Sequence, residues 1–310
     1  MSDLAAPLSA PLAAPPARAR APLPAVLTGA EADAVLDAAV EGLVTGKAVP
    51  FLGPGLLAMS GDTVPVPTTP EAVAAALNRF TAAPGRIRTN MWSVAQYIEQ
   101  RRHRRTLIAN MAEIFAPMVA PSPLHLALAR LEHLSMIVDT WYDGAMRDAL
   151  SIRDDWAEVQ GVTRALETFD VWWRAYGPEG QEIAPSELEA ARLLVYKPHG
   201  AVIPSKNFLV ADSDYVEVLT EIDIQSPIPQ AVKDRRATRG FVFLGCRFHD
   251  QMLRTYARQI IKRSKGPHVV VVDRPEDLTR NELKFFADQL IVPVAADLAS
   301  FTTRLQAATA

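Results

Sequence analysis

The sequence contains a single cysteine, Cys246, among 310 residues. One cysteine cannot form an intrachain disulfide, and it cannot build a zinc site that needs several thiolates. We therefore expect no bound metal. The low cysteine content suits a reducing compartment, and we expect a cytoplasmic protein.

Long apolar runs are absent as well. No stretch approaches the ~18 uninterrupted apolar residues of a membrane-spanning helix, so we do not expect a membrane protein. Residues 1–25 are rich in Ala and Pro, and they lack the basic start and continuous apolar centre of a secretion signal. Because this composition offers little to bury, we predict a disordered tail there.

The chain has little net charge of either sign. A formal net charge of −3 gives no long-range attraction to nucleic acid. The basic run at residues 101–105 is a local exception, but it lies in a helical stretch and is followed by apolar residues. We interpret it as a solvated helix face and do not expect nucleic-acid binding.

The remaining residues, 26–310, are expected to form one domain. Apolar residues at helical spacing predict a helix over 28–45, with Gly46 where the helix ends. Residues 69–71 and 122–123 each combine an N-cap hydroxyl with a proline in the first turn, which predicts two further helix starts.

Short apolar runs rich in Val, Ile and Leu alternate with these helical segments. They predict strands at residues 48–52, 136–138, 193–196, 241–244 and 268–272. This pattern is typical of an α/β, Rossmann-like fold, in which helices cover both faces of a parallel sheet. Residues 151–190 contain no obvious strand, and we predict a mainly helical insertion there. Ligands of such sheets bind at the carboxyl ends of the strands.

The first predicted strand ends at Gly53-Pro54-Gly55. Two glycines at this place can let backbone N–H groups approach a pyrophosphate, because a side chain would block the contact. A glycine pair is also common in ordinary turns, and Pro54 removes one donor. The loop alone leaves both interpretations open.

Five segments in order carry a family resemblance. Residues 53–61, GPGLLAMSG, resemble the sirtuin opening G-A-G-x-S-x-x-S-G, and residues 138–143, VDTWYD, are similar to the T-T-N-Y-D loop of bacterial sirtuin-like proteins. Residues 197–200, KPHG, are similar to the H-G motif of the family. Residues 209–219 and 243–250 resemble two later segments of the sirtuin-like branch. Because the five segments follow one another in the order of the family, the chain is identified as sirtuin-like.

The resemblance implies NAD as the ligand and His199 as a base on a ribose hydroxyl, since histidine titrates near neutral pH. Asp143 keeps an acidic position of the family, which implies a second catalytic residue that orients a ribose or the loop itself, although it could also be a solvated turn residue. His199 could otherwise cap a strand end, and Cys246 is most simply a small buried residue. The residues implied to hold the nucleotide are Gly53, Gly55, Ser60, Trp141, Gly200, Gly245 and Cys246.

Two departures from the family limit what the resemblance implies. Sirtuin deacetylases carry a four-cysteine zinc ribbon, which this chain cannot build, so we do not expect protein deacetylation. Trp141 also replaces the asparagine of the T-T-N-Y-D loop. An indole can stack, but it lacks the paired donor and acceptor of an amide.

Two functions therefore stay open. The first is an NAD glycohydrolase that releases nicotinamide and ADP-ribose. The second is a catalytically degenerate module that senses NAD or ADP-ribose, or that serves as a scaffold for a protein partner or a homo-oligomer. Trp141 and Pro54 favour the second hypothesis, a catalytically degenerate module.

Overall fold

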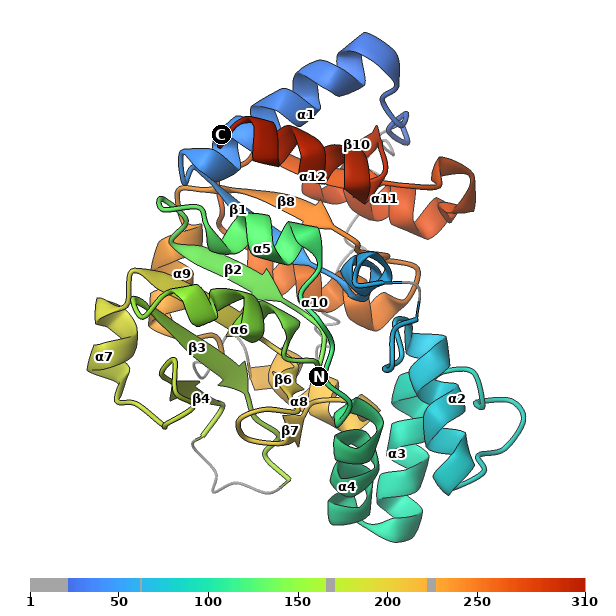
Figure 1. Ribbon diagram of the computed structural model, residues 1–310. Coiled ribbons are helices and arrows are strands. Elements are labelled where there is room, and N and C mark those ends of the chain that lie inside the picture. The colour runs from blue at the N-terminus through green and yellow to red at the C-terminus, as the bar shows by residue number, and fades with distance from the viewer. Residues whose placement is uncertain (1–21, 62, 166–170, 222–226, 310) are drawn as a thin grey trace, which may run out of the picture.

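The computed structural model describes residues 22–61, 63–165, 171–221 and 227–309. The tail predicted at residues 1–25 therefore lies outside the described residues except for its last four positions. The chain forms three layers, with an eight-stranded sheet between two layers of helices (Figure 1).

The central sheet has the strand order β10-β9-β8-β1-β2-β5-β3-β4. All neighbouring strands are parallel except β3 and β4, which are antiparallel. The strands are β1 (Ala48–Leu52), β2 (Met136–Asp139), β3 (Trp156–Gly161), β4 (Trp173–Tyr176), β5 (Leu193–Lys197), β8 (Gly240–Leu244), β9 (His268–Val272) and β10 (Ile291–Ala295). A separate hairpin pairs β6 (Gly200–Ala201) with β7 (Asn207–Phe208).

Buried strand residues alternate between two apolar clusters, one on each face of the sheet. Val49 and Phe51 of β1 belong to one cluster, whereas Ala48 and Leu52 belong to the other. Such alternation requires cover on both faces, which explains the continuous apolar runs in the sequence. The five strands predicted from those runs are confirmed.

The first helix layer packs on the Leu52 side of the sheet. It consists of α1 (Gly29–Val44), α5 (Pro123–Ala129), α6 (Ala145–Ala149) and α12 (Leu298–Ala307). The opposite side is covered by α8 (Asp212–Glu221), α9 (Gln230–Arg236), α10 (Gln251–Ile261) and α11 (Arg280–Gln289). The predicted α/β fold with helices on both faces is therefore confirmed.

The prediction of a mainly helical insertion at residues 151–190 is wrong. This segment contributes β3 and β4 to the sheet, and the helical parts of its described residues are the end of η2 (Leu150–Ile152) and α7 (Pro185–Ala190). Strand β3 was missed because polar Glu158 and Gln160 interrupt its apolar pattern. Both side chains are buried and bonded to each other, and Gln160 also donates to the carbonyl of Ile203 at 2.7 Å.

A helical segment does exist, but it lies between β1 and β2. Helices α2 (Pro70–Phe80), α3 (Met91–Arg102) and α4 (Arg104–Phe115) pack against one another and project from one end of the sheet (Figure 1). The remaining short elements are η1 (Pro54–Met59) and η3 (Pro275–Asp277).

Both predicted helix starts are confirmed by their caps. The hydroxyl of Thr69 accepts a hydrogen bond from the Ala72 amide at 3.1 Å, and that of Ser122 accepts one from the His125 amide at 3.3 Å. In contrast, the basic run at residues 101–105 is not a uniform solvated face. His103 has a φ of 71°, which separates α3 from α4 and turns Arg104 inward, where only 7% of it is exposed.

Strand β10 was not predicted, because Pro293 interrupts its apolar run. The strand lies at the edge of the sheet, where a proline costs no hydrogen bond of the ladder.

None of the helices in the described ranges is both long and apolar enough to cross a membrane.

Candidate functional site

The order of the strands places a switch point between β1 and β8. From β1 the chain crosses to β2 on one side, and it later returns to β8 on the other side. Ligand crevices form at the carboxyl ends of strands at such a point. A cavity of about 710 Å³ lies there, and residues that follow six of the strands line it.

The two predicted glycines shape the contact between the loops after β1 and β8. A Cβ atom on Gly53 would lie 2.4 Å from the Gly245 carbonyl oxygen, and one on Gly55 would lie 2.8 Å from it. The amide of Gly53 donates to Leu244 O at 2.9 Å, and that of Gly55 donates to Gly245 O at 2.9 Å. The two glycine amides that were candidates for binding a pyrophosphate are therefore bonded within the protein. Gly53, Gly55 and Gly245 still line the cavity.

Two predicted nucleotide contacts lie outside the cavity wall. Ser60 ends η1, and its buried hydroxyl has no hydrogen-bond partner among the described residues. Gly200 begins β6 with a φ of 75°, and a Cβ there would lie 2.1 Å from Asn207 O. Gly200 thus permits the β6–β7 hairpin to close. Neither residue lines the cavity.

His199 follows β5 and lies in the cavity wall with 5% of its surface exposed. Its Nδ1 atom lies 3.0 Å from Thr140 O. A carbonyl can only accept, so Nδ1 carries the proton and Nε2 presents its lone pair. Nε2 is buried and has no hydrogen-bond partner among the described residues. Burial lowers the pKa of His199 to about 4, although the hydrogen bond to Thr140 O acts in the opposite direction and raises it. The ring is therefore neutral at pH 7.

Three tyrosines surround this imidazole. The ring centroids of Tyr142, Tyr215 and Tyr256 lie 6.4, 5.4 and 4.8 Å from that of His199. All three tyrosines line the cavity, and burial raises the pKa of each hydroxyl. The surroundings of His199 are therefore aromatic and exclude most water.

Trp141 lines the same cavity from the end of β2. Its indole N–H donates to Pro67 O at 2.8 Å, and its ring packs edge-on against Phe115 of α4. The donor of the indole is thus bonded to the segment that leads into α2. What remains for a ligand is a stacking surface.

Asp143 does not line the cavity, although the sequence suggested a catalytic role for it. It is 3% exposed, and its Oδ1 accepts from the Ala145 amide at 2.8 Å at the start of α6. Burial and the nearby Asp139 raise the pKa of Asp143 to about 6. Asp139 itself is paired with the buried Lys197.

Cys246 lies in the cavity wall and contacts the end of β1. Its thiol donates to Phe51 O at 3.4 Å. Burial raises the pKa of the thiol well above its usual value, so the thiol stays protonated at neutral pH. A protonated thiol is a poor nucleophile, which agrees with its interpretation as a small packing residue.

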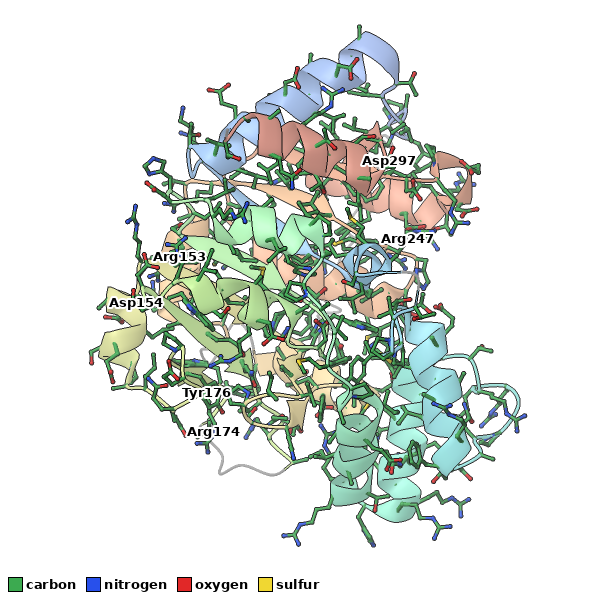
Figure 2. The ribbon with its side chains drawn as sticks, viewed as in Figure 1. Arg153, Asp154, Arg174, Tyr176, Arg247 and Asp297 are labelled. Atoms are coloured by element: carbon green, nitrogen blue, oxygen red, sulfur yellow. The ribbon has the colours of Figure 1, made fainter. Side chains whose placement is uncertain are left out.

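Arg247 is a cavity residue that the sequence did not single out. Its Nε and Nη2 atoms bond to the carboxylate of Glu282 at 2.9 and 3.1 Å, and Nη2 also donates to Asp277 O at 2.7 Å. Glu282 is buried, yet Arg247 and two backbone amides hold its pKa at about 2. A charged pair therefore fixes one partly exposed guanidinium in the cavity wall, and Figure 2 labels Arg247 below the α11 and α12 side of the molecule.

No sequence signal could have found this pair, because Arg247 and Glu282 are 35 residues apart. A second polar contact in the cavity wall joins His249 Nε2 and Glu71 Oε1 at 3.1 Å. Within the described residues, no group of three or more His, Cys, Asp or Glu side chains is placed to hold a metal ion.

Comparison with known proteins gives three results. A search of curated proteins gives no match. The chain is similar to a solved structure described as "Structural Basis for the Mechanism and Regulation of Sir2 Enzymes", with 14% identity and a TM-score of 0.38, over 88% of this chain and 98% of that one. The sequence matches the SIR2-like domain family over residues 135–294, which is more than half of the chain. The chain therefore belongs to the SIR2-like domain family.

Proposed function

We propose that the protein binds NAD in the cavity at the β1–β8 switch point and hydrolyses it to nicotinamide and ADP-ribose. Membership of the SIR2-like domain family suggests an NAD-binding function. The observation that carries the proposal is the Nε2 atom of His199, which is buried in the cavity wall and unpartnered among the described residues.

The cavity suits a ligand of this kind. Its volume of about 710 Å³ falls within the range of small-molecule sites. Aromatic side chains form the wall near His199, whereas Arg247 and His249 bring polar groups to the wall after β8. An aromatic end beside a charged end matches a molecule that joins a ring, a sugar and phosphates.

His199 would act on the sugar. The Thr140 carbonyl fixes the proton on Nδ1, so Nε2 is the nitrogen that can accept a proton from a ribose hydroxyl. Because the pKa of His199 is lowered, this nitrogen is free of a proton across the neutral range. The imidazole therefore needs no deprotonation before it can act as a base.

Arg247 would contact the pyrophosphate. Glu282 and Asp277 O hold Nε and Nη2, which sets the plane of the guanidinium before any ligand arrives. A preoriented guanidinium binds phosphate oxygens more strongly than a neutral donor does. In the reaction, the bond between nicotinamide and ribose breaks, water forms the new bond to the ribose carbon, and a proton leaves that water.

A second function is favoured by one observation. Trp141 presents a ring to the cavity while its N–H is bonded to Pro67, so the loop has no amide at the position where the family has one. A protein with this site could bind NAD or ADP-ribose as a sensor without turning it over. A scaffold for a protein partner or a homo-oligomer would need no ligand at all.

Nicotinamide release separates these functions. Purified protein is incubated with NAD, and nicotinamide is measured by chromatography for wild type, His199→Gln and His133→Gln. His133 is exposed at the opposite end of the sheet, and its variant is the matched control. We expect release by wild type and the control only. If wild type releases no nicotinamide, calorimetry measures whether it binds NAD. Binding would indicate a sensor, and no binding would indicate a scaffold.

A further inference from the structure

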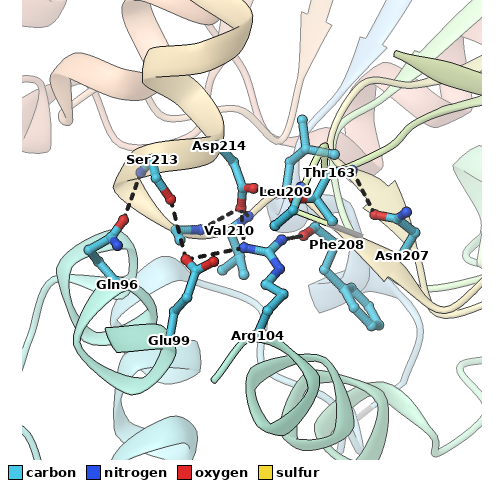
Figure 3. A network of polar contacts seen from close by, with 12 residues as sticks. Gln96, Glu99, Arg104, Thr163, Asn207, Phe208, Leu209, Val210, Ser213 and Asp214 are labelled. Atoms are coloured by element: carbon cyan, nitrogen blue, oxygen red, sulfur yellow. Dashed lines mark hydrogen bonds and ion pairs between the residues drawn. The ribbon is translucent and has the colours of Figure 1, made fainter. Parts of the chain in front are cut away.

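A buried ion pair joins the helical segment to the side of the cavity. Arg104 at the start of α4 directs Nη1 to Asp214 Oδ2 at 2.9 Å, and its Nη2 donates to Phe208 O (Figure 3). Only 7% and 2% of the two side chains are exposed. This pair lies outside the cavity wall and is not part of the proposed chemistry.

The carboxylate of Asp214 connects three distant segments. Besides Arg104, Oδ2 accepts from the amides of Val210 and Ala211, each at 2.9 Å. Oδ1 accepts from the Thr163 hydroxyl at 2.7 Å, beyond the end of β3. The start of α8, the end of β3 and the start of α4 therefore meet at one side chain, as Figure 3 shows.

Two short routes lead from this pair to His199. Tyr215 follows Asp214 in α8, and its ring lies 5.4 Å from the imidazole, with Trp92 of α3 edge-on to it at 6.3 Å. In addition, Leu209 donates its amide to His199 O at 2.9 Å, and Leu209 directly follows the carbonyl that Arg104 binds.

We propose that Arg104 and Asp214 are positioning residues, which hold Tyr215 and Leu209 against His199 so that its ring keeps its place in the cavity wall. A buried ion pair seldom stabilises a fold more than apolar residues of similar volume would. Its value here lies in geometry, because a guanidinium fork can bind Asp214 and Phe208 at the same time. The part of the inference that concerns turnover depends on the proposed function, whereas the part that concerns His199 does not.

The local backbone supports this interpretation. His103 adopts a φ of 71°, an uncommon value for a residue with a side chain. This conformation breaks the helix between α3 and α4 and lets Arg104 leave the basic face that its neighbours form. Glu99 of α3 lies 3.5 Å from Arg104 and accepts from the Ser213 hydroxyl at 3.2 Å, which is one of several further bonds between the helical segment and α8.

The test uses the double variant R104M/D214N, which removes both charges together, so that no unpaired charge stays buried. The histidine rings are labelled with ¹³C and ¹⁵N, and the His199 resonance is assigned by its loss in His199→Gln. We expect this resonance to shift in the double variant, because Tyr215 contributes a ring current at 5.4 Å. In nicotinamide release, we expect kcat to fall at least tenfold while KM changes less than threefold.

Arg153→Met is the matched control. Arg153 also combines an ion pair, to Asp155 at 2.8 Å, with bonds to the carbonyls of Ala129 and Leu131. Arg153 does not line the cavity. Figure 2 labels it on the left of the molecule, whereas Arg247 of the cavity wall is labelled on the right. We expect a lower melting temperature for this variant, with an unchanged His199 resonance and an unchanged kcat.

An unchanged His199 resonance in folded R104M/D214N would overturn the inference. If the double variant does not fold, R104K decides, because lysine keeps the charge but lacks the planar fork whose two nitrogens bond Asp214 and Phe208 separately. A shifted His199 resonance in R104K supports the inference, and an unchanged one overturns it. A wild type that releases no nicotinamide would contradict the proposed function, and the resonance would still decide the positioning role.

Discussion

The Nδ1 atom of His199 donates to Thr140 O over 3.0 Å, and this bond joins the ends of β5 and β2. It fixes the tautomer of the imidazole before any ligand binds. The nitrogen left without a proton is Nε2, which has no partner among the described residues. The site therefore presents a neutral base at the carboxyl edge of the sheet.

Burial of this base makes the stability of the fold depend on pH. The pKa of His199 is about 4 in the folded chain, against 6.5 for an ordinary histidine. As the pH falls through this window, the unfolded chain takes up the proton more readily than the folded chain, so stability falls. We expect His199→Gln to remove about 2 kcal/mol of the stability loss between pH 7 and pH 5.

Urea denaturation at the two pH values measures this effect. His125 is the matched comparison, because burial also lowers its pKa to about 4 and it does not line the cavity. His125→Gln should remove a similar share of the loss. Equal pH dependence in wild type and His199→Gln would show that His199 titrates normally.

Sequence predicted those parts of the fold that rest on local pattern. Apolar runs located five strands, and hydroxyl caps located two helix starts, because each signal lies within a few residues. Strand β3 was missed because Glu158 is polar, and its buried position depends on Arg147 of α6. A single-sequence pattern contains no trace of such a partner.

In the candidate site too, residues with a local sequence signal were predicted, and residues that depend on a distant partner were not. His199 and the glycine loops were found at strand ends, where a parallel sheet brings them together. Arg104 was placed on a solvated face, because its partner Asp214 is 110 residues away. Long-range pairs decide where charged side chains lie, and spacing along the chain does not encode them.

The contact between the β1 and β8 loops can be tested through Gly53. Its φ of −106° suits any residue, so the cost of Gly53→Ala is steric, from a Cβ placed 2.4 Å from Gly245 O. We expect a loss of about 1–3 kcal/mol in the free energy of unfolding. Gly85→Ala is the control, since a Cβ there meets nothing within 4 Å. Similar urea midpoints for both variants would argue against the close contact.

Trp141→Asn restores the amide that the family has in this loop. The change also removes an indole packed on Phe115, and we expect a loss of about 3–5 kcal/mol from the cavity that it leaves. If Trp141 provides the stacking surface of an active enzyme, nicotinamide release should fall in the folded variant. Release that rises above the wild type would instead identify a degenerate enzyme, and chromatography distinguishes the two results.

Arg247→Met should weaken NAD binding about tenfold, because it removes a preoriented charged donor worth about 1.5 kcal/mol. Calorimetry measures the affinity at fixed salt. Arg174→Met is the control, because Arg174 forms an exposed pair with Glu182 and does not line the cavity. Equal affinities for both variants would remove Arg247 from the site.

The most direct test of the central claim is the rate of nicotinamide release against pH for wild type and His199→Gln. We expect release by wild type that needs His199 and that persists as the pH falls from 8 to 5.5, because the pKa of His199 is about 4. Asp143→Asn is the comparison, because the pKa of Asp143 is about 6 and an acid limb that this variant abolished would belong to Asp143 and not to His199. No release by wild type above His199→Gln, at any pH, would contradict the account.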